Sequence, residues 1–149
     1  MRMRRLLLII SLLSISTFGL KAQDKDKGFF SSIRKGIASF YHDKFEGRRT
    51  ATGEVFDNNK FTAASNTHKL GTYLKVTNLS NGEVVYVRVN DRMSKTNDRL
   101  VDLASIAAKR LGFAQKGLAK VKVEAVPVQE GKRGVIAQSG LNKIRRIQL

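Results

Sequence analysis

Residues 84–111, VVYVRVNDRMSKTNDRLVDLASIAAKRL, show the clearest alternation of apolar and polar positions in the chain. Val85, Val87 and Val89 fall on every second position, so an extended backbone places them on one face of a β-strand. Asp91 keeps the same parity, which predicts a carboxyl group at the rim of an apolar face if the strand persists that far. Loss of water at such a rim favours the protonated acid. The alternative is a solvated Asn-Asp turn after the strand, because turns favour both residues.

Further short apolar runs, separated by turn signals, flank this stretch. They predict strands at residues 37–41, 61–64, 73–77, 84–89 and 121–125, and another short strand at 100–101. Asn81-Gly82 lies between two of these runs and is a strong hairpin signal. Many short strands with one or two short helices are typical of a small β-barrel, so the predicted fold class is mainly β.

Residues 103–111 instead follow the spacing of a helix. Asp102 is placed to cap that helix at its start, and Gly112 is placed to end it. Pro127 closes the final predicted strand. The remainder, residues 128–149, carries five basic side chains against one acid and three glycines, so we predict a basic, mostly disordered tail.

The first 22 residues have the pattern of a secretory signal. Arg2, Arg4 and Arg5 precede an uncharged apolar run at residues 6–20, which is short for a membrane span. We therefore predict a signal peptide at residues 1–22, a linker at 23–35, and export to the periplasm or cell envelope. No other segment has the pattern of a membrane span.

The formal net charge is +16, and removing the four basic residues of the signal leaves 16 − 4 = +12. Such a charge indicates an anionic partner or surface, with plain solubility as the alternative. Nucleic acid is the usual candidate, but predicted export favours an anionic wall polymer or membrane face. The chain has no cysteine, and no cluster of metal ligands is evident, so we expect neither metal nor cofactor.

Several blocks together carry a family resemblance: GIASFYHDKFEGRRTATGEVFD (residues 36–57), FTAAS (61–65), LGTYLKVTNLSNGEVVYVRVNDR (70–92), RLVDLASIAAKRLGF and GLAKVKVEAV. In this order they resemble the rare lipoprotein A (RlpA-like) lytic transglycosylases. The resemblance implies a six-stranded double-psi β-barrel over residues 36–127 that acts on peptidoglycan glycan strands. It implies cleavage between N-acetylmuramic acid and N-acetylglucosamine, in which the muramoyl 6-hydroxyl attacks its own anomeric carbon and leaves a 1,6-anhydro end.

The same resemblance implies roles for particular residues. Asp91 matches the family's catalytic acid in its N-D-R motif, and Glu54 and Asp57 match further acids expected to position groups and stabilise charge. Substrate binding is expected of a set of four polar residues: Tyr41, Ser65, Asn90 and Arg92. Phe40 and Tyr41 point to opposite faces of a strand, so one of the two is expected in the core.

The chain departs from the family where the usual T-A-A-H motif reads T-A-A-S, with Ser65 in place of histidine. Serine cannot carry charge near neutral pH as imidazole can. His68 lies three residues on, and we expect an exposed loop residue there rather than one that folds back into the cleft. For Asp102, which together with Arg99 matches a family block, we favour the helix cap over a role in the site.

Two further functions stay open from the sequence. The substitution at position 65 leaves room for a wall-binding or wall-loosening module without turnover. The basic tail leaves room for a cationic surface protein whose barrel serves only as a scaffold.

Overall fold

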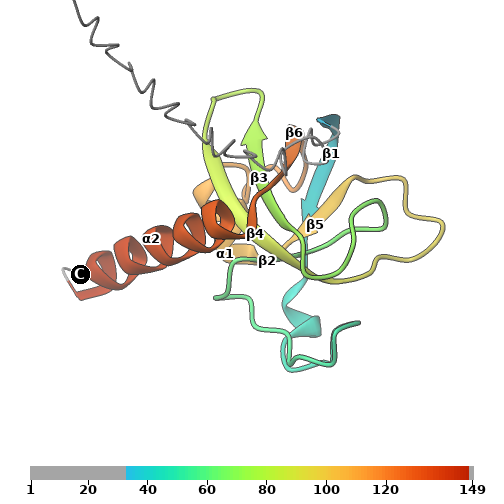
Figure 1. Ribbon diagram of the computed structural model, residues 1–149, viewed down its shortest axis with the longest axis horizontal. Helices are drawn as coiled ribbons and strands as arrows, with labels where there is room; N and C mark the ends of the chain where they lie inside the picture. The colour runs from blue at the N-terminus through green and yellow to red at the C-terminus, as the bar shows by residue number, and fades with distance from the viewer. Residues whose placement is uncertain (1–32, 148–149) are drawn as a thin grey trace, which may run out of the picture.

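The computed structural model describes residues 33–147, with side chains up to residue 141. The predicted signal at residues 1–22 lies outside the described residues, as does most of the predicted linker. The described part contains six strands, two α-helices and one short 3-10 helix (Figure 1). In chain order they are β1 (Arg34–Phe40), η2 (Asp43–Phe45), β2 (Thr62–Ala64), β3 (Tyr73–Asn78), β4 (Val84–Asp91), β5 (Val101–Leu103), α1 (Ser105–Arg110), β6 (Ala119–Val126) and α2 (Val128–Ile147).

The six strands close into a barrel in the order β1-β5-β2-β4-β3-β6, which confirms the predicted six-stranded barrel. Two pairs of neighbours, β1 with β5 and β2 with β4, run parallel, and the other four pairs run antiparallel. The hairpin between β3 and β4 turns at Gly82, whose φ of 76° suits glycine, as the Asn-Gly signal predicted. All the strands expected from the apolar runs are present.

The barrel interior is filled by the alternating apolar positions. Val85, Val87 and Val89 of β4 are fully buried, and residues between them, such as Tyr86, are part-exposed. Leu74 and Val123 show the same behaviour on neighbouring strands. The period-two pattern therefore identified the core-facing residues of β4 up to Val89, and Val121 and Val123 of β6.

The helix α1 begins later than predicted, and Asp102 is not its cap. Asp102 belongs to β5, and the N-cap residue Ala104 offers no side-chain hydrogen bond. Asn58, from a distant loop, takes over this function. Its Oδ1 accepts from the Ser105 N–H at 3.0 Å and its backbone oxygen accepts from the Ile106 N–H at 3.1 Å.

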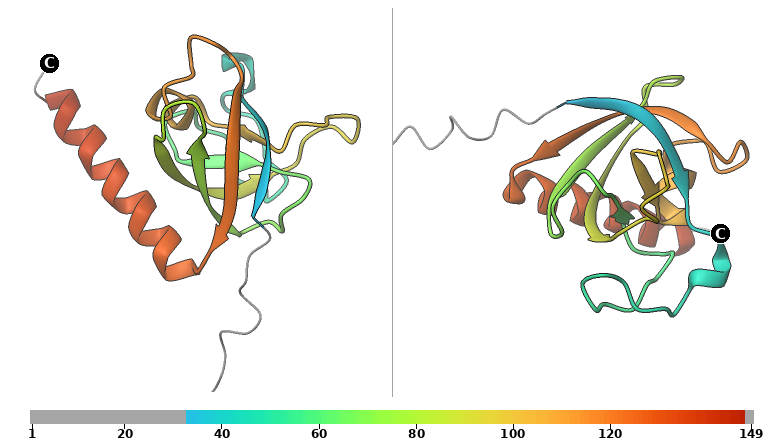
Figure 2. Two further views of the ribbon diagram at one scale, coloured as in Figure 1. Left: turned by 90° about the horizontal axis from the view of Figure 1, so that it is seen from above. Right: turned by 90° about the vertical axis from the view of Figure 1, so that its right-hand side faces the viewer.

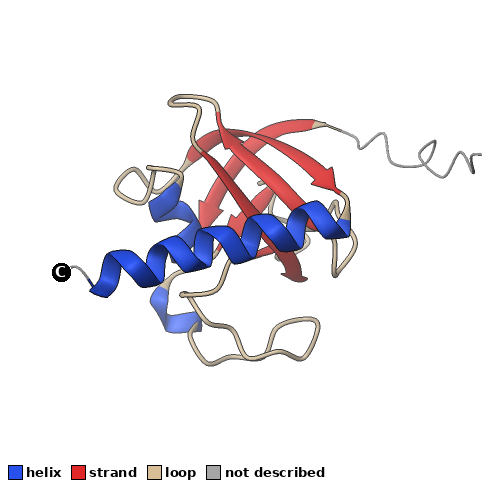
Figure 3. Ribbon diagram, turned by 60° about the vertical axis from the view of Figure 1, so that its left-hand side comes forward, coloured by secondary structure: helices blue, strands red, loops and turns tan. Residues whose placement is uncertain are grey.

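The predicted disordered tail is instead the long helix α2, which lies along the outside of β3 and β4 and projects past the barrel (Figures 2 and 3). Gly131 and Gly134 face the rings of Tyr73 and Tyr86, where a Cβ atom would overlap those rings. Gln138 is buried and forms hydrogen bonds with both the backbone N–H and the backbone oxygen of Tyr86. Because β2 is too short to pair with this part of β4, the side-chain amide of Gln138 replaces a strand partner there.

None of the helices within residues 33–147 combines the length and apolar character that a membrane span requires. Within the same residues, no group of three or more histidine, aspartate or glutamate side chains is arranged to hold a metal ion.

Candidate functional site

A groove of about 640 Å³ opens on the barrel surface between the loop that follows β1 and the loop that follows β4. Figure 1 shows both loops projecting from the strands. Four aromatic rings, five cationic side chains and two acids line the groove. The lining comprises Phe40, Tyr41, His42, Lys44, Phe45, Arg48, Arg49, Phe56, Asp91, Arg92, Met93, Ser94, Asn97, Arg99 and Asp102.

Strand register brings the two acids of the groove onto one face. Ser39 pairs with Asp102, Asp102 with Ala64, and Ala64 with Asp91, so these residues form a row across β1, β5, β2 and β4. Paired residues project to the same side of a sheet, and neighbouring strands lie about 4.8 Å apart. The backbones of the two aspartates are thus about 10 Å apart, with only the methyl group of Ala64 between them.

The predicted face of Asp91 is wrong, although β4 does extend to this residue. The register between β2 and β4 shifts after the pair Ala63–Val89, so the next pair is Ala64–Asp91 and Asn90 is the additional residue. Such an irregularity reverses the alternation beyond it. Asp91 therefore projects from the face opposite the core valines, into the groove.

Three donors surround the Asp91 carboxyl group. Oδ1 accepts from the backbone N–H groups of Ala51 and Arg92, each at 2.8 Å, and Oδ2 accepts from the Tyr41 hydroxyl at 2.7 Å. Oδ1 has both of its lone pairs engaged, whereas Oδ2 keeps one acceptor position. The carboxyl group is thus fixed in orientation, with Oδ2 as the oxygen available to a ligand.

Tyr41 holds this position through ring contacts. Its ring centroid lies 4.3 Å from that of Phe56 and 5.8 Å from that of Phe45. Burial, followed by the hydrogen bond and negative charge of Asp91 and then the charge of Asp102, raises the pKa of the Tyr41 hydroxyl well above its usual value. The hydroxyl therefore stays a donor throughout the physiological range. Phe40 packs against Phe113 at the core, as expected for the neighbour of a groove residue.

Asp102 is the groove residue whose function the sequence misassigned. The Ser39 hydroxyl donates to its Oδ1, and Arg99 Nη2 lies 3.6 Å from its Oδ2. Burial raises the pKa of the Asp102 carboxyl, and the charge of Arg99 opposes that change. The alternation of apolar and polar residues in the sequence could have revealed the position of Asp102. Val101 and Leu103 are fully buried, so Asp102 between them points away from the core.

Glu54 does not line the groove but braces it from behind. Arg88 Nη1 and Nη2 donate to its two oxygens at 2.9 and 2.6 Å, and Asn90 Nδ2 donates at 3.2 Å. Chiefly through the Arg88 hydrogen bonds, the pKa of Glu54 falls to about 2. The Thr52 N–H also donates to the Asn90 backbone oxygen at 3.1 Å, so this cluster fixes the turn that presents the Ala51 N–H to Asp91.

Asp57 also lies outside the groove lining. Its Oδ1 accepts from the Asn59 N–H at 2.8 Å, and its Oδ2 lies 4.0 Å from Lys60 Nζ. This arrangement is a local turn contact at the end of the loop. Asp91, Tyr41 and Arg92 are thus the predicted site residues that the fold brings together in the groove.

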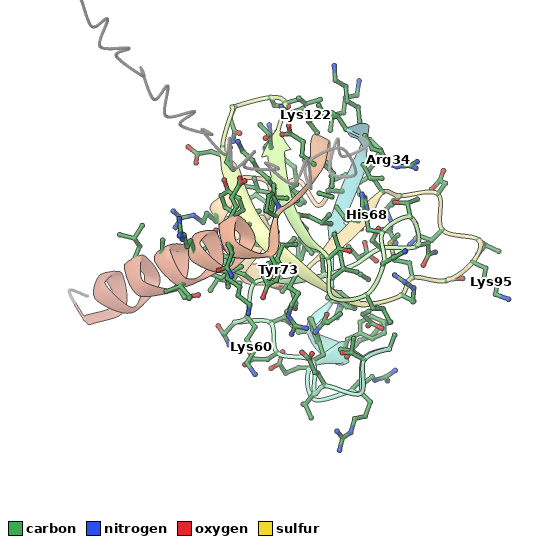
Figure 4. All side chains as sticks on the ribbon, viewed as in Figure 1. Arg34, Lys60, His68, Tyr73, Lys95 and Lys122 are labelled. Atoms are coloured by element: carbon green, nitrogen blue, oxygen red, sulfur yellow. The ribbon has the colours of Figure 1, made fainter. Side chains whose placement is uncertain are left out.

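Ser65 is fully buried and does not reach the groove. Its hydroxyl donates to the Leu100 backbone oxygen at 3.2 Å and lies 3.0 Å from His68 Nδ1. His68 is also buried, so its predicted exposure is wrong. Burial lowers the pKa of its imidazole, and the positive charge of Arg34 lowers it further. Figure 4 labels both residues. Arg92 Nη1 donates to the backbone oxygens of both residues, so the buried turn fixes this groove arginine.

Comparison with known proteins finds a matching family model and several related proteins. A family model described as lytic transglycolase matches residues 33–123. The endolytic peptidoglycan transglycosylase RlpA of Haemophilus influenzae is 42% identical over 112 residues, which are 75% of this chain and 38% of that protein. The protein of the same name from Pseudomonas aeruginosa (strain UCBPP-PA14) is 53% identical over 95 residues, which are 63% of this chain and 28% of that protein.

Solved structures support the fold alone. An expansin from Clavibacter michiganensis matches with a TM-score of 0.53 and 20% identity, over 64% of this chain and 51% of the expansin. The Streptomyces papain inhibitor matches with a TM-score of 0.53 and 21% identity, over 64% of this chain and 96% of the inhibitor. The names of these two proteins indicate different functions, so their likeness to this chain says nothing about activity.

The family match covers more than half of the chain and includes both groove aspartates and every strand of the barrel except the last three residues of β6. The blocks of sequence that resembled the rare lipoprotein A proteins lie within it or extend only slightly past it. On these grounds the chain belongs to the lytic transglycolase family.

Proposed function

We propose that the groove cleaves the glycan strands of peptidoglycan between N-acetylmuramic acid and N-acetylglucosamine, with a 1,6-anhydro-muramoyl product. The two relatives are named peptidoglycan transglycosylases, which supports peptidoglycan as the substrate. The observation that carries the proposal is the Asp91 carboxyl group, which is oriented by three donors and offers Oδ2 to the groove.

The proposed chemistry needs one carboxyl group and no water. A proton on Asp91 Oδ2 passes to the glycosidic oxygen as the bond from that oxygen to the muramoyl anomeric carbon breaks. The muramoyl 6-hydroxyl oxygen then bonds to the same carbon, and its proton returns to Asp91 Oδ2. The substrate supplies the nucleophile already in place, so a second carboxylate to activate water is not required.

The other predicted site residues take positioning roles in this proposal. Glu54 and Asn90 hold the turn that carries the Ala51 N–H, and Asp57 shapes the end of the same loop. Arg92, fixed by the turn at Ser65, lines the groove beside Asp91. The contacts of Glu54 and Asn90 and the Arg92 N–H fix where Asp91 points, and Asp57 shapes only its own loop; none of these contacts touches the reacting atoms.

The site of action follows from the substrate. Peptidoglycan lies outside the cytoplasmic membrane, and the sequence pattern of residues 1–22 fits export by a signal peptide. We therefore propose action in the periplasm or cell envelope. The chain spans 38% of the length of its Haemophilus relative, so activities that depend on the remainder of that protein lie beyond this proposal.

A wall-binding module without turnover is the alternative. The specific observation behind it is Ser65, which stands in place of the family's usual histidine and is buried beneath the groove rather than lining it. Under this alternative the protein sediments with peptidoglycan but releases no soluble product.

Digestion of purified peptidoglycan with the wild type, Asp91→Asn and Asp98→Asn distinguishes these functions. Asp98 is exposed in the loop after β4 and is absent from the groove lining, so its variant is the matched control. The proposal expects anhydro-muramoyl products from the wild type and Asp98→Asn, and at least a hundredfold less from Asp91→Asn. Equal yields from all three reject Asp91 as the acid, and binding without product from the wild type supports the alternative.

A further inference from the structure

We propose that Lys44 and Arg48 form a carboxylate-binding subsite at the rim of the groove. This inference rests on the proposed function and adds to it a preference among glycan strands. The subsite would recognise a free carboxylate carried by a substituent of the sugar beside the bond to be cleaved.

In the loop after β1, the acidic and the basic side chains face different directions. Asp43 and Glu46 both bond to Asn58, which donates to Asp43 Oδ1 at 3.2 Å and to Glu46 Oε2 at 2.8 Å. These acids therefore face the base of their own loop. Lys44 and Arg48, between and beyond them in sequence, line the groove instead. If all four charged side chains were simply solvated, the acids and the cations would not be expected to face different directions.

Lys44 and Arg48 converge on one aromatic ring. Lys44 Nζ lies 5.4 Å from the centroid of Phe45, and Arg48 Cζ lies 5.3 Å from it. Both side chains are exposed, and neither forms an ion pair with any carboxylate of the described residues. The ring gives the two cations a common platform but leaves their charge uncompensated.

The other groove arginines are already engaged. Arg99 Nη2 lies 3.6 Å from Asp102 Oδ2, Arg92 donates to the backbone oxygens of Ser65 and His68, and Arg49 Nη1 donates to the Gly53 backbone oxygen at 2.8 Å. Lys44 and Arg48 are therefore the groove cations whose charged groups have no oxygen acceptor among the described residues. An anionic ligand group would find its best partner there.

The rim lies at a suitable separation from Asp91 for a sugar substituent. The Phe45 centroid is 5.8 Å from that of Tyr41, and the Tyr41 hydroxyl is 2.7 Å from Asp91 Oδ2. The contacts from the two cations to the proposed acid thus run through two adjacent rings, Phe45 and Tyr41. In peptidoglycan, a carboxylate at this point can come from the lactyl group of an unsubstituted muramic acid or from a stem peptide.

Binding of four soluble glycan ligands tests the subsite: peptide-bearing and peptide-free strands, each with native or amidated carboxylates. All proteins carry Asp91→Asn so that no strand is cut, and affinity is measured by fluorescence anisotropy. The rim variant Lys44→Gln/Arg48→Gln should bind a native strand about five- to tenfold more weakly, because two exposed ion pairs are lost. It should bind the amidated strand as tightly as the parent does, and added salt should reduce the difference on native strands.

The matched control is Lys132→Gln/Arg133→Gln, which removes the same two residue types from exposed positions on α2. Its affinity for all four ligands should stay near the parent value. Lys44→Arg/Arg48→Lys keeps both charges and should retain binding, which separates charge loss from misfolding. A loss on peptide-bearing strands alone identifies a peptide carboxylate, and a loss on peptide-free strands alone identifies the lactyl group.

Unchanged binding of native strands by the rim variant would overturn the subsite, and so would an equal loss on native and amidated strands. These outcomes are independent of turnover. If the wild type releases no anhydro product, the proposed function fails while the charge dependence of binding still decides the subsite.

Discussion

Replacing Tyr41 by phenylalanine removes one hydrogen bond from Asp91 and little else. The ring contacts with Phe56 at 4.3 Å and Phe45 at 5.8 Å can remain, because they do not involve the hydroxyl. The lost contact is the 2.7 Å hydrogen bond to Asp91 Oδ2, the oxygen that we propose transfers the proton. Hydrogen bonds to charged groups contribute about 1.5–3 kcal/mol.

If that energy holds Oδ2 in its reactive orientation, Tyr41→Phe should lower the rate of cleavage roughly ten- to hundredfold. Loss of the same hydrogen bond should also lower the melting temperature by several degrees, while the variant stays folded at the assay temperature. The assay is the initial rate of anhydro-muramoyl product formation at saturating substrate, together with thermal unfolding of both proteins. Loss of rate with unchanged substrate affinity would indicate an effect on the reacting carboxyl group.

Tyr86→Phe is the matched control. The Tyr86 hydroxyl also donates to a carboxylate, Glu130 Oε1 at 3.1 Å, but neither Tyr86 nor Glu130 lines the groove. It should retain full activity. If Tyr41→Phe is as active as the wild type, the hydrogen bond does not orient the acid and the reasoning from the groove geometry fails.

Three other outcomes follow from the contacts. Glu54→Gln should reduce cleavage at neutral pH, since it weakens the pairing with Arg88 that steadies the turn beside Asp91. The pKa of Glu54 is lowered from 4.5 to about 2 in the folded protein, so the stabilisation by this ion pair is present above pH 4.5 and is lost as the pH falls toward 2. An acid titration of the melting temperature checks this loss. Burial lowers the pKa of His68 below its usual 6.5, so the imidazole takes up a proton more readily in the unfolded chain than in the folded protein. The stability of the wild type should therefore fall as the pH drops below about 6.5. In His68→Gln, thermal unfolding should show a smaller fall over the same pH range. Gly134→Ala should destabilise the protein by about 1–3 kcal/mol, because the new methyl group overlaps the Tyr86 ring. In a helix without that contact, alanine would instead stabilise by up to about 1 kcal/mol. The sign of the change in the free energy of unfolding, measured with denaturant, therefore reports whether α2 packs against the barrel.

The strands were predictable because their chemistry is local. Burial of Val85, Val87 and Val89 follows from alternation alone, and the turn at Gly82 follows from its Asn-Gly signal. The direction of Asp91 was not predictable in the same way. It depends on a register shift against β2, a strand some 25 residues upstream, and nothing in the sequence of β4 marks where the shift falls.

Two further errors have a similar origin. Asp102 matched the local signal for a helix cap, but the cap comes from Asn58, which only the closed barrel brings near α1. Helix α2 has a composition typical of disorder, and its order depends on tertiary contacts instead. Its glycines fit against the rings of Tyr73 and Tyr86, and that complementarity exists only once β3 and β4 have formed.

The origin of the oxygen atoms in the product tests the central claim most directly. Peptidoglycan is digested with the wild-type protein in water enriched in heavy oxygen, and the new muramoyl ends are analysed by mass spectrometry. If the muramoyl 6-hydroxyl is the nucleophile and its proton passes to Asp91, the ends lack one water relative to a hydrolysis product and carry no heavy oxygen. Muramoyl ends that incorporate heavy oxygen at the anomeric carbon would mean that water is the nucleophile, and would contradict the account.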